Sequence, residues 1–214
     1  MTSVRKVAGV LVLGLLFCAS VAMAADIVSF HFINTGGNTL GGVPVYPYYA
    51  SVNNGPEITV TCDDFYHLSN PGDTWDAYRT FLVGGDISHT RFAGLPNAFT
   101  TYQQIAWLAA QEPLVDRATE GTINWAIWEL TSPGLQFTDP NPPGEQQQID
   151  NWIQAAEKNY LNNPAPWENL TIYTPVDAPD QEMIEIEVAS PEPSTMLLLG
   201  TSIVGLWSQR KRLL

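Results

Sequence analysis

An apolar run at each end of this 214-residue chain limits the part that can fold as a domain. At the N-terminal end, a basic pair at residues 5–6 precedes an apolar run over 7–21 and the tripeptide Ala-Met-Ala at 22–24. A charged start, an apolar stretch and a small-x-small site are typical of a secretory signal peptide. We therefore expect residues 1–24 to be a signal peptide that signal peptidase removes after residue 24.

The C-terminal apolar run, over residues 195–207, lies between a proline-rich motif and a basic cluster. The motif before it is Pro191, Glu192, Pro193 and Ser194, and the cluster after it is Arg210, Lys211 and Arg212. The prolines keep the preceding segment extended. The run is shorter than the roughly 20 apolar residues of a full membrane helix, so we expect a marginal single membrane segment with its basic end in the cytoplasm.

This order of motif, apolar run and basic cluster resembles the PEP-CTERM sorting signal of Gram-negative bacteria. The resemblance implies that residues 191–214 pass transiently into the inner membrane. It also implies that an exosortase-type membrane protease removes them and delivers the protein to the outer surface or to the extracellular matrix of a biofilm. A plain C-terminal membrane anchor is the alternative interpretation.

Residues 25–190 remain between the two signals, a length that suits one domain. Of the 9 basic and 22 acidic residues of the chain, five basic and one acidic lie in the signals, which leaves 4 against 21 and a net charge of −17. A nucleic-acid partner is not expected, because phosphate binding needs a basic patch. Cysteine and histidine spacings typical of zinc sites are absent from the sequence, and we expect neither a metal nor a cofactor.

The spacing of apolar residues along 25–190 alternates as in strands in some segments and follows a helical period in others. Alternation predicts strands at 26–34, 58–62, 170–173 and 184–188, with a short β-prone patch at 78–83. The run 43–52 contains Pro44 and Pro47 and so predicts an edge strand. Helical spacing predicts three helices, over 102–111, 122–131 and 149–161. Strands, then helices, then strands indicate an α+β domain, a mostly antiparallel β unit with an inserted cluster of about three helices.

Cys62 is the only cysteine outside the expected signal peptide. A secreted protein with one cysteine forms no internal disulfide, so the thiol is unpaired, intermolecular or otherwise used. The alternation around Cys62 places it on the apolar face of its strand. It is therefore either a small buried residue of the core or a functional nucleophile.

Three segments taken together carry a second resemblance: Thr-Cys-Asp-Asp at 61–64, Tyr-Gln-Gln-Ile-Ala-Trp-Leu at 102–108 and Asn-Trp-Ala-Ile-Trp-Glu-Leu at 124–130. They resemble the thioester domains of bacterial surface adhesins. The resemblance implies a bond between the Cys62 sulfur and the side-chain carbonyl of residue 124. The family has Gln there and this chain has Asn124, whose side chain is one methylene shorter.

Three further residues complete the candidate site. His67 could act as a general base toward the Cys62 thiol. Asp63 disfavours a thiolate, although it could orient other groups. Trp128 lies one helical turn after Asn124 and could cover the site and exclude water. The plainer interpretations are core packing for Trp128 and a hydrogen-bonding amide for Asn124.

The sequence thus predicts an exported, non-enzymatic surface or matrix protein with a structural or adhesive role and no catalytic residues. Its partner would be an extracellular polysaccharide or a surface protein. Two alternatives stay open. One is a covalent adhesin with an internal thioester at Cys62, and the other is a secreted hydrolase that uses Cys62 and His67.

Overall fold

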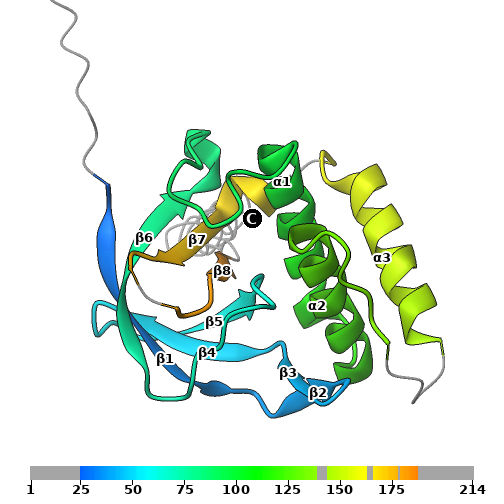
Figure 1. Ribbon diagram of the computed structural model, residues 1–214, viewed down its shortest axis with the longest axis horizontal. Coiled ribbons are helices and arrows are strands. Elements are labelled where there is room, and N and C mark those ends of the chain that lie inside the picture. The colour runs from blue at the N-terminus through cyan, green and yellow to red at the C-terminus, as the bar shows by residue number, and fades with distance from the viewer. Residues whose placement is uncertain (1–24, 139–143, 163–165, 178, 188–214) are drawn as a thin grey trace, which may run out of the picture.

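The computed structural model describes residues 25–138, 144–162, 166–177 and 179–187. Within them the chain forms a six-stranded barrel with three helices on one side (Figure 1). The expected signal peptide at 1–24 and the expected sorting tail at 191–214, with its apolar run, lie outside the described residues. Among the described residues, none of the helices is both long enough and apolar enough to cross a bilayer.

All neighbouring strands of the barrel are antiparallel, in the order β1, β4, β5, β8, β7, β6 and back to β1. They are β1 (Ile27–Thr35), β4 (Tyr48–Val52), β5 (Glu57–Cys62), β6 (Thr74–Phe81), β7 (Leu170–Pro175) and β8 (Met183–Ile186). In β1, Val28, Phe30 and Phe32 are buried while the residues between them are not, as the alternation predicts. The inward side chains fill the barrel with a continuous core.

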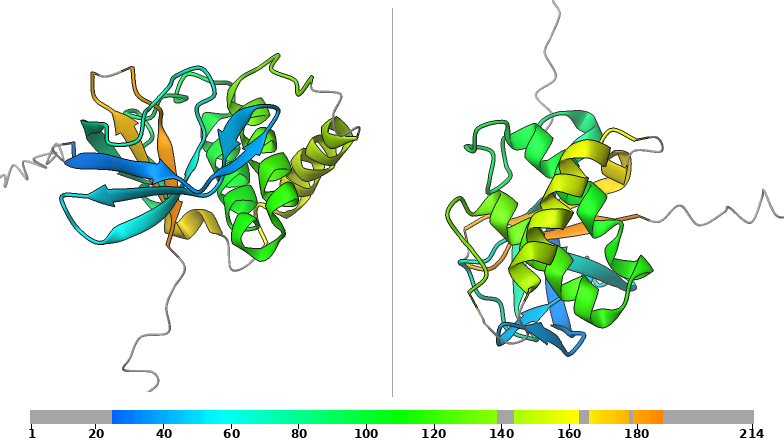
Figure 2. Two further views of the ribbon diagram at one scale, coloured as in Figure 1. Left: turned by 90° about the horizontal axis from the view of Figure 1, so that it is seen from below. Right: turned by 90° about the vertical axis from the view of Figure 1, so that its right-hand side faces the viewer.

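The helices lie between β6 and β7 in the chain and pack on one another beside the barrel. They are α1 (Ala98–Ala109), α2 (Arg117–Thr131) and α3 (Glu145–Asn159), accompanied by the short 3₁₀ turns η1 (Leu82–Gly84), η2 (Glu112–Leu114) and η3 (Pro166–Asn169). Helix α3 lies outermost and packs on α1 and α2 (Figures 1 and 2). Helix α2 is buried along most of its length, including Ile123 and Ile127, and it carries the candidate site residues.

A two-stranded hairpin joins the barrel to α2. It consists of β2 (Asn38–Leu40) and β3 (Val43–Val45), and both strands contact α2. Gly41 turns the hairpin with a positive φ of 62°, and a Cβ there would approach the Phe137 ring to 2.8 Å. Glycine is therefore required at this position both for its backbone conformation and for the space.

The α+β class is confirmed, with three helices inserted in an antiparallel β unit, but the predicted edge strand at 43–52 is wrong. The run divides into β3 and β4, and β4 pairs with both β1 and β5, so it has no open edge. Pro47 separates the two strands because it has no N–H to donate to a neighbouring strand. Both prolines of the run therefore lie outside the six barrel strands.

Helix α2 begins at Arg117, well before the predicted start at residue 122. The carboxylate of Asp116 caps it, accepting hydrogen bonds from the backbone N–H groups of Ala118 at 3.1 Å and Thr119 at 3.0 Å. An aspartate in this position satisfies donors that the first turn leaves open. The predicted β-prone patch at 78–83 overlaps the second half of β6.

Candidate functional site

Cys62 is the last residue of β5, and its side chain is completely buried. Its thiol donates a hydrogen bond to the main-chain oxygen of Asp64 at 3.3 Å, and the Asp64 N–H lies 3.4 Å from the sulfur. Burial raises the pKa of the thiol well above its ordinary value, and the nearby Asp63 carboxyl raises it further. Burial thus favours the protonated thiol over the thiolate, and Cys62 forms no disulfide with the described residues.

Asn124, on α2, lies beside Cys62 and holds its main chain. The Asn124 amide nitrogen donates to the Cys62 carbonyl oxygen at 2.8 Å, and the amide oxygen accepts from the Tyr46 N–H at 2.9 Å. Asn124 is fully buried. The fold thus brings residues 62 and 124 together, and the Asn124 carboxamide joins α2 to the end of β5 and to the segment before β4.

Trp128 lies against Cys62 within a cluster of aromatic rings. Its ring centroid is 5.2 Å from that of Phe65 and 5.3 Å from that of Trp125, and its side chain is almost fully buried. Its indole N–H makes no hydrogen bond of ordinary geometry with the described residues. It is near enough to the Cys62 sulfur to oppose part of the rise in the thiol pKa.

His67 lies on the loop after β5, where it binds Asp64 and Arg91. Its Nδ1 is 2.9 Å from the Asp64 carboxylate, and its Nε2 is 3.0 Å from Nη1 of Arg91. The Arg91 Nε in turn lies 2.8 Å from the Asp64 carboxylate, which is nearly completely buried. Within the described part of the chain, no hydrogen bond joins His67 to Cys62.

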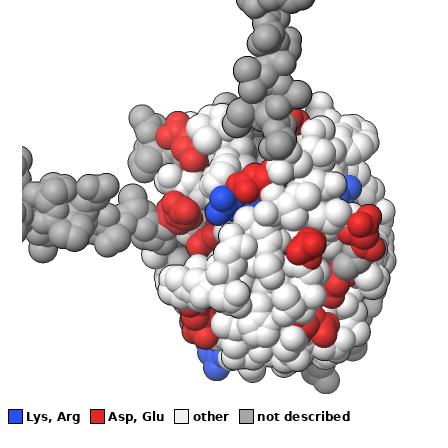
Figure 3. All heavy atoms as spheres, turned by 90° about the vertical axis from the view of Figure 1, so that its left-hand side faces the viewer, with Lys and Arg blue, Asp and Glu red and all other residues white. Residues whose placement is uncertain are grey.

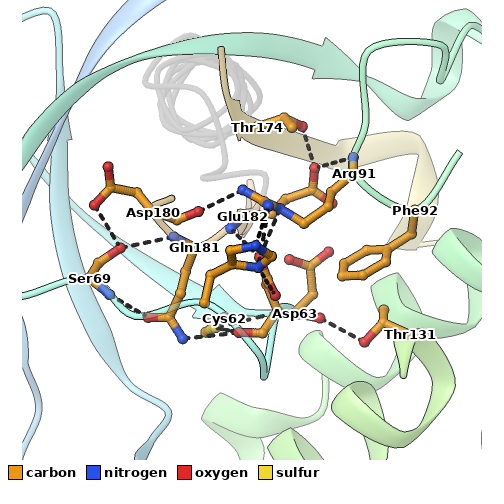
Figure 4. A network of polar contacts seen from close by, with 12 residues as sticks. Cys62, Asp63, Ser69, Arg91, Phe92, Thr131, Thr174, Asp180, Gln181 and Glu182 are labelled. Carbon is orange, nitrogen blue, oxygen red and sulfur yellow. Dashed lines mark hydrogen bonds and ion pairs between the residues drawn. The ribbon is translucent and has the colours of Figure 1, made fainter. Parts of the chain in front are cut away.

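Asp63 and Glu182 form a pair of buried acids that the sequence did not predict. Glu182 accepts a hydrogen bond from the Tyr102 hydroxyl at 2.5 Å. It also accepts from the Arg91 main-chain N–H at 2.8 Å and from the Thr174 hydroxyl (Figure 4). The carboxyl oxygens of Asp63 accept no hydrogen bond of ordinary geometry from the described residues. Burial raises the pKa of Asp63 well above its usual value, and the charge of Glu182 raises it further. We infer that Glu182 is the ionised member and Asp63 the protonated one.

A third buried acid, Glu112 in η2, accepts a hydrogen bond from the Thr61 hydroxyl at 2.5 Å. Burial raises the pKa of this carboxyl well above its usual value. The end of β5 is therefore surrounded by carboxyl groups whose pKa burial raises and by Asp64, which pairs with Arg91. Among the residues that the structure describes, no cluster of three or more His, Cys, Asp or Glu side chains is arranged to hold a metal ion.

The C-terminal segment matches a known family, the PEP-CTERM protein-sorting motif, over residues 191–212. The chain carries a PEP-CTERM sorting signal. The motif implies that an exosortase processes the protein at the membrane and that the protein is exported to the cell surface. The resemblance seen in the sequence is thus confirmed. No curated protein matches the chain significantly.

Two solved structures are similar to this chain at low sequence identity. The N-terminal thioester domain of a surface protein from Clostridium perfringens is 14% identical with a TM-score of 0.46, and the match covers 76% of this chain and 99% of that one. The N-terminal domain of the Streptococcus pyogenes pilus tip adhesin Cpa is 13% identical with a TM-score of 0.44, and the match covers 77% and 95%. A likeness this distant assigns no role to any residue here.

The PEP-CTERM motif follows the barrel closely, because β8 ends at Ile186 and only four residues separate it from Pro191. Strand β8 begins beside the end of β5, where Met183 pairs with Cys62. The site around Cys62 therefore lies at one end of the barrel, and the chain continues toward the sorting signal from the other end.

A cavity of about 130 Å³ opens at the same end of the barrel as Cys62. Trp128 belongs both to the wall of this cavity and to the surroundings of the Cys62 sulfur. The remaining lining residues are Phe32, Thr35, Val43, Pro44, Tyr48, Phe65, His67, Leu68, Ser69 and Gln181.

Proposed function

We propose that the protein is an exosortase-processed surface or extracellular-matrix module with a non-covalent structural or adhesive role. The observation that carries this proposal is the PEP-CTERM motif four residues after the last barrel strand. A closed barrel without free strand edges suits a protein that must stay folded outside the cell. Carboxylates spread over the face in Figure 3, with few basic residues between them, suit a soluble exported domain.

The surroundings of Cys62 support a non-covalent role. A nucleophilic thiol needs a stabilised thiolate, whereas burial and Asp63 both raise the pKa of Cys62. The Asn124 carboxamide is engaged at both its nitrogen and its oxygen. The hydrolase alternative has weaker support, because the ring of His67 contacts Asp64 and Arg91 rather than the thiol.

The sorting step predicts that replacing Pro191, Glu192 and Pro193 together with alanine traps the protein in the inner membrane. An exosortase would no longer recognise the motif, while the apolar run would still hold the chain. Cell fractionation with immunoblotting checks this outcome. The matched control replaces Pro140, Asn141 and Pro142 with alanine, which should leave export unchanged. Normal release of the motif variant would refute the proposed sorting.

A covalent adhesin with a Cys62–Asn124 thioester is the second candidate, favoured by the contact between Asn124 and the Cys62 main chain. In that reaction the Cys62 sulfur bonds to the Asn124 side-chain carbonyl carbon, and the amide nitrogen leaves as ammonia. The product would be lighter than the unmodified chain by one ammonia, and methylamine would open it.

The non-covalent proposal predicts an unmodified intact mass for the exported protein, measured by mass spectrometry. It also predicts that iodoacetamide labels Cys62 only after denaturation, because the thiol is fully buried and burial raises its pKa. The Cys62→Ser variant is the control for labelling at any other site. A mass deficit of one ammonia that disappears in Cys62→Ser would favour the covalent adhesin instead.

A further inference from the structure

The cavity at the Cys62 end of the barrel has the size and walls of a binding site for one apolar side chain. Its volume of about 130 Å³ is close to that of an engineered protein cavity, about 150 Å³, that binds benzene. Four aromatic residues, Phe32, Tyr48, Phe65 and Trp128, contribute to its walls. Such walls suit a leucine- or phenylalanine-sized group.

The polar edge of the cavity lies beside two carboxylates, and also beside the basic groups His67 and Arg91. Ser69 lines the cavity, and its hydroxyl lies 3.4 Å from the carboxylate of Asp180. The residue after Ser69 is Asn70, and its backbone N–H donates a hydrogen bond to the Asp73 carboxylate at 2.7 Å. Partial burial raises the pKa of Asp180, the charge of Asp73 raises it further, and the charge of Arg91 opposes part of the rise, so Asp73 and Asp180 repel each other. A further cation beside them would relieve that repulsion.

The position of the cavity leaves it open to a partner during and after sorting. The cavity residues lie where β8 begins, and the chain runs to the PEP-CTERM motif from where β8 ends. The four residues between barrel and motif span at most about 14 Å when extended. The uncleaved sorting segment is therefore joined to the end of the barrel opposite the cavity.

We propose that this cavity binds one leucine- or phenylalanine-sized side chain of a basic peptide segment on a partner protein. Lysine or arginine residues beside that side chain pair with Asp73 and Asp180. The net charge of −17 between the two signals attracts such a segment. A second copy of this chain is disfavoured as the partner, because its equal negative charge repels this one. The inference rests on the proposed surface role and names the chemistry of its partner.

The test titrates the exported protein with three tripeptide amides, Lys-Phe-Lys, Lys-Gly-Lys and Glu-Phe-Glu, by isothermal titration calorimetry. Only Lys-Phe-Lys is expected to bind saturably, at least about tenfold more tightly than the other two, because it supplies both the ring and the cations. Its binding should weaken as salt is added. Equal binding of Glu-Phe-Glu, or no saturable binding of Lys-Phe-Lys, would overturn the inference.

Two variants locate the binding. Val43→Phe fills the cavity from its wall and should weaken Lys-Phe-Lys binding about tenfold or more. The matched control Val83→Phe, at a residue 61% exposed in η1, should leave it unchanged. Asp180→Asn should weaken binding about threefold and reduce its salt dependence. If Val43→Phe does not fold, Asp180→Asn alone tests whether the peptide binds at the cavity.

Unchanged binding in Val43→Phe, or in Asp180→Asn, would place the peptide elsewhere and contradict the assignment. The titration uses purified protein, so its failure leaves the proposed surface role standing. A failure of sorting in the cell fractionation experiment would likewise be visible without any change in peptide binding.

Discussion

The Asp63→Asn variant is expected to be more stable than the parent protein at about pH 8, by roughly 1 to 3 kcal/mol. In the folded parent, the Asp63 carboxyl is fully buried, faces the charge of Glu182 and has no hydrogen-bond donor of ordinary geometry among the described residues. It must therefore keep a proton that solvent would remove. Asparagine has the same shape and is always neutral, so it removes this penalty.

The same arrangement fixes the sign of the pH dependence of stability. The unfolded chain releases the Asp63 proton near pH 4, whereas the folded chain keeps it to higher pH. The folded state therefore binds more protons over this interval, and its stability falls as the pH rises, by up to about 1.4 kcal/mol per pH unit for each such group. Burial raises the pKa of Glu112 and Glu182 as well, and both act in the same direction.

Urea unfolding followed by circular dichroism at about pH 5, 7 and 9 checks this expectation. The parent should be most stable at the lowest of these values, and Asp63→Asn should have the flatter profile. The matched control Asp86→Asn, at a fully exposed aspartate whose pKa Ser88 lowers, should leave the slope nearly unchanged. A variant profile as steep as that of the parent would mean that Asp63 is ionised in the folded state.

Glu182→Gln should lower the free energy of unfolding, whereas Asp63→Asn should raise it, although both substitutions remove an acid from the pair. Three donors point at the Glu182 carboxylate, from Tyr102, Arg91 and Thr174. A glutamine side chain has an NH₂ group in place of one carboxylate oxygen, so at least one of these three donors would face another donor. We expect a loss of about 2 to 4 kcal/mol at about pH 7. Equal effects of the two substitutions would contradict the assignment of the proton to Asp63.

Local patterns in the sequence were sufficient to predict most strands and helices but not the closed barrel. Alternation in β1 identifies the buried face because successive side chains point to opposite sides. It does not identify the neighbouring strand. The barrel closes through pairs such as Ile27 with Tyr78 and Cys62 with Met183, which are distant in sequence. No local pattern encodes such pairings, and the inserted helices lengthen the separation.

The candidate site, like the fold, was predictable from the sequence only in part. The proximity of Cys62 and Asn124 followed from a resemblance between segments, and helical spacing placed Trp128 beside Asn124. The pair of Asp63 and Glu182 was missed because two adjacent acids after a strand are typical of a solvated turn. The available signal was Glu182 itself, an acid immediately before the apolar start of β8, but only the pairing of β5 with β8 shows that it is buried.

Asn124→Ala is expected to lower the free energy of unfolding by about 2 to 4 kcal/mol. The substitution leaves the Tyr46 N–H and the Cys62 carbonyl without the partners they have in the fold, and each unsatisfied buried group costs about 1 to 3 kcal/mol. The melting temperature of a domain of this size should fall by roughly 5 to 15 °C. Asn151→Ala, at an exposed position of α3, is the matched control and should have little effect.

We expect the Asn124 amide also to control access to the Cys62 thiol, because it attaches α2, which carries Trp128, to the end of β5. Asn124→Ala should therefore make Cys62 react with iodoacetamide under conditions in which the parent and Asn151→Ala stay protected. Asn124→Gln keeps the carboxamide but adds a methylene to a packed interior, so a loss of about 1 to 3 kcal/mol is expected. An Asn124→Ala protein with parent stability and a protected thiol would show that the amide does not hold the helix to the barrel.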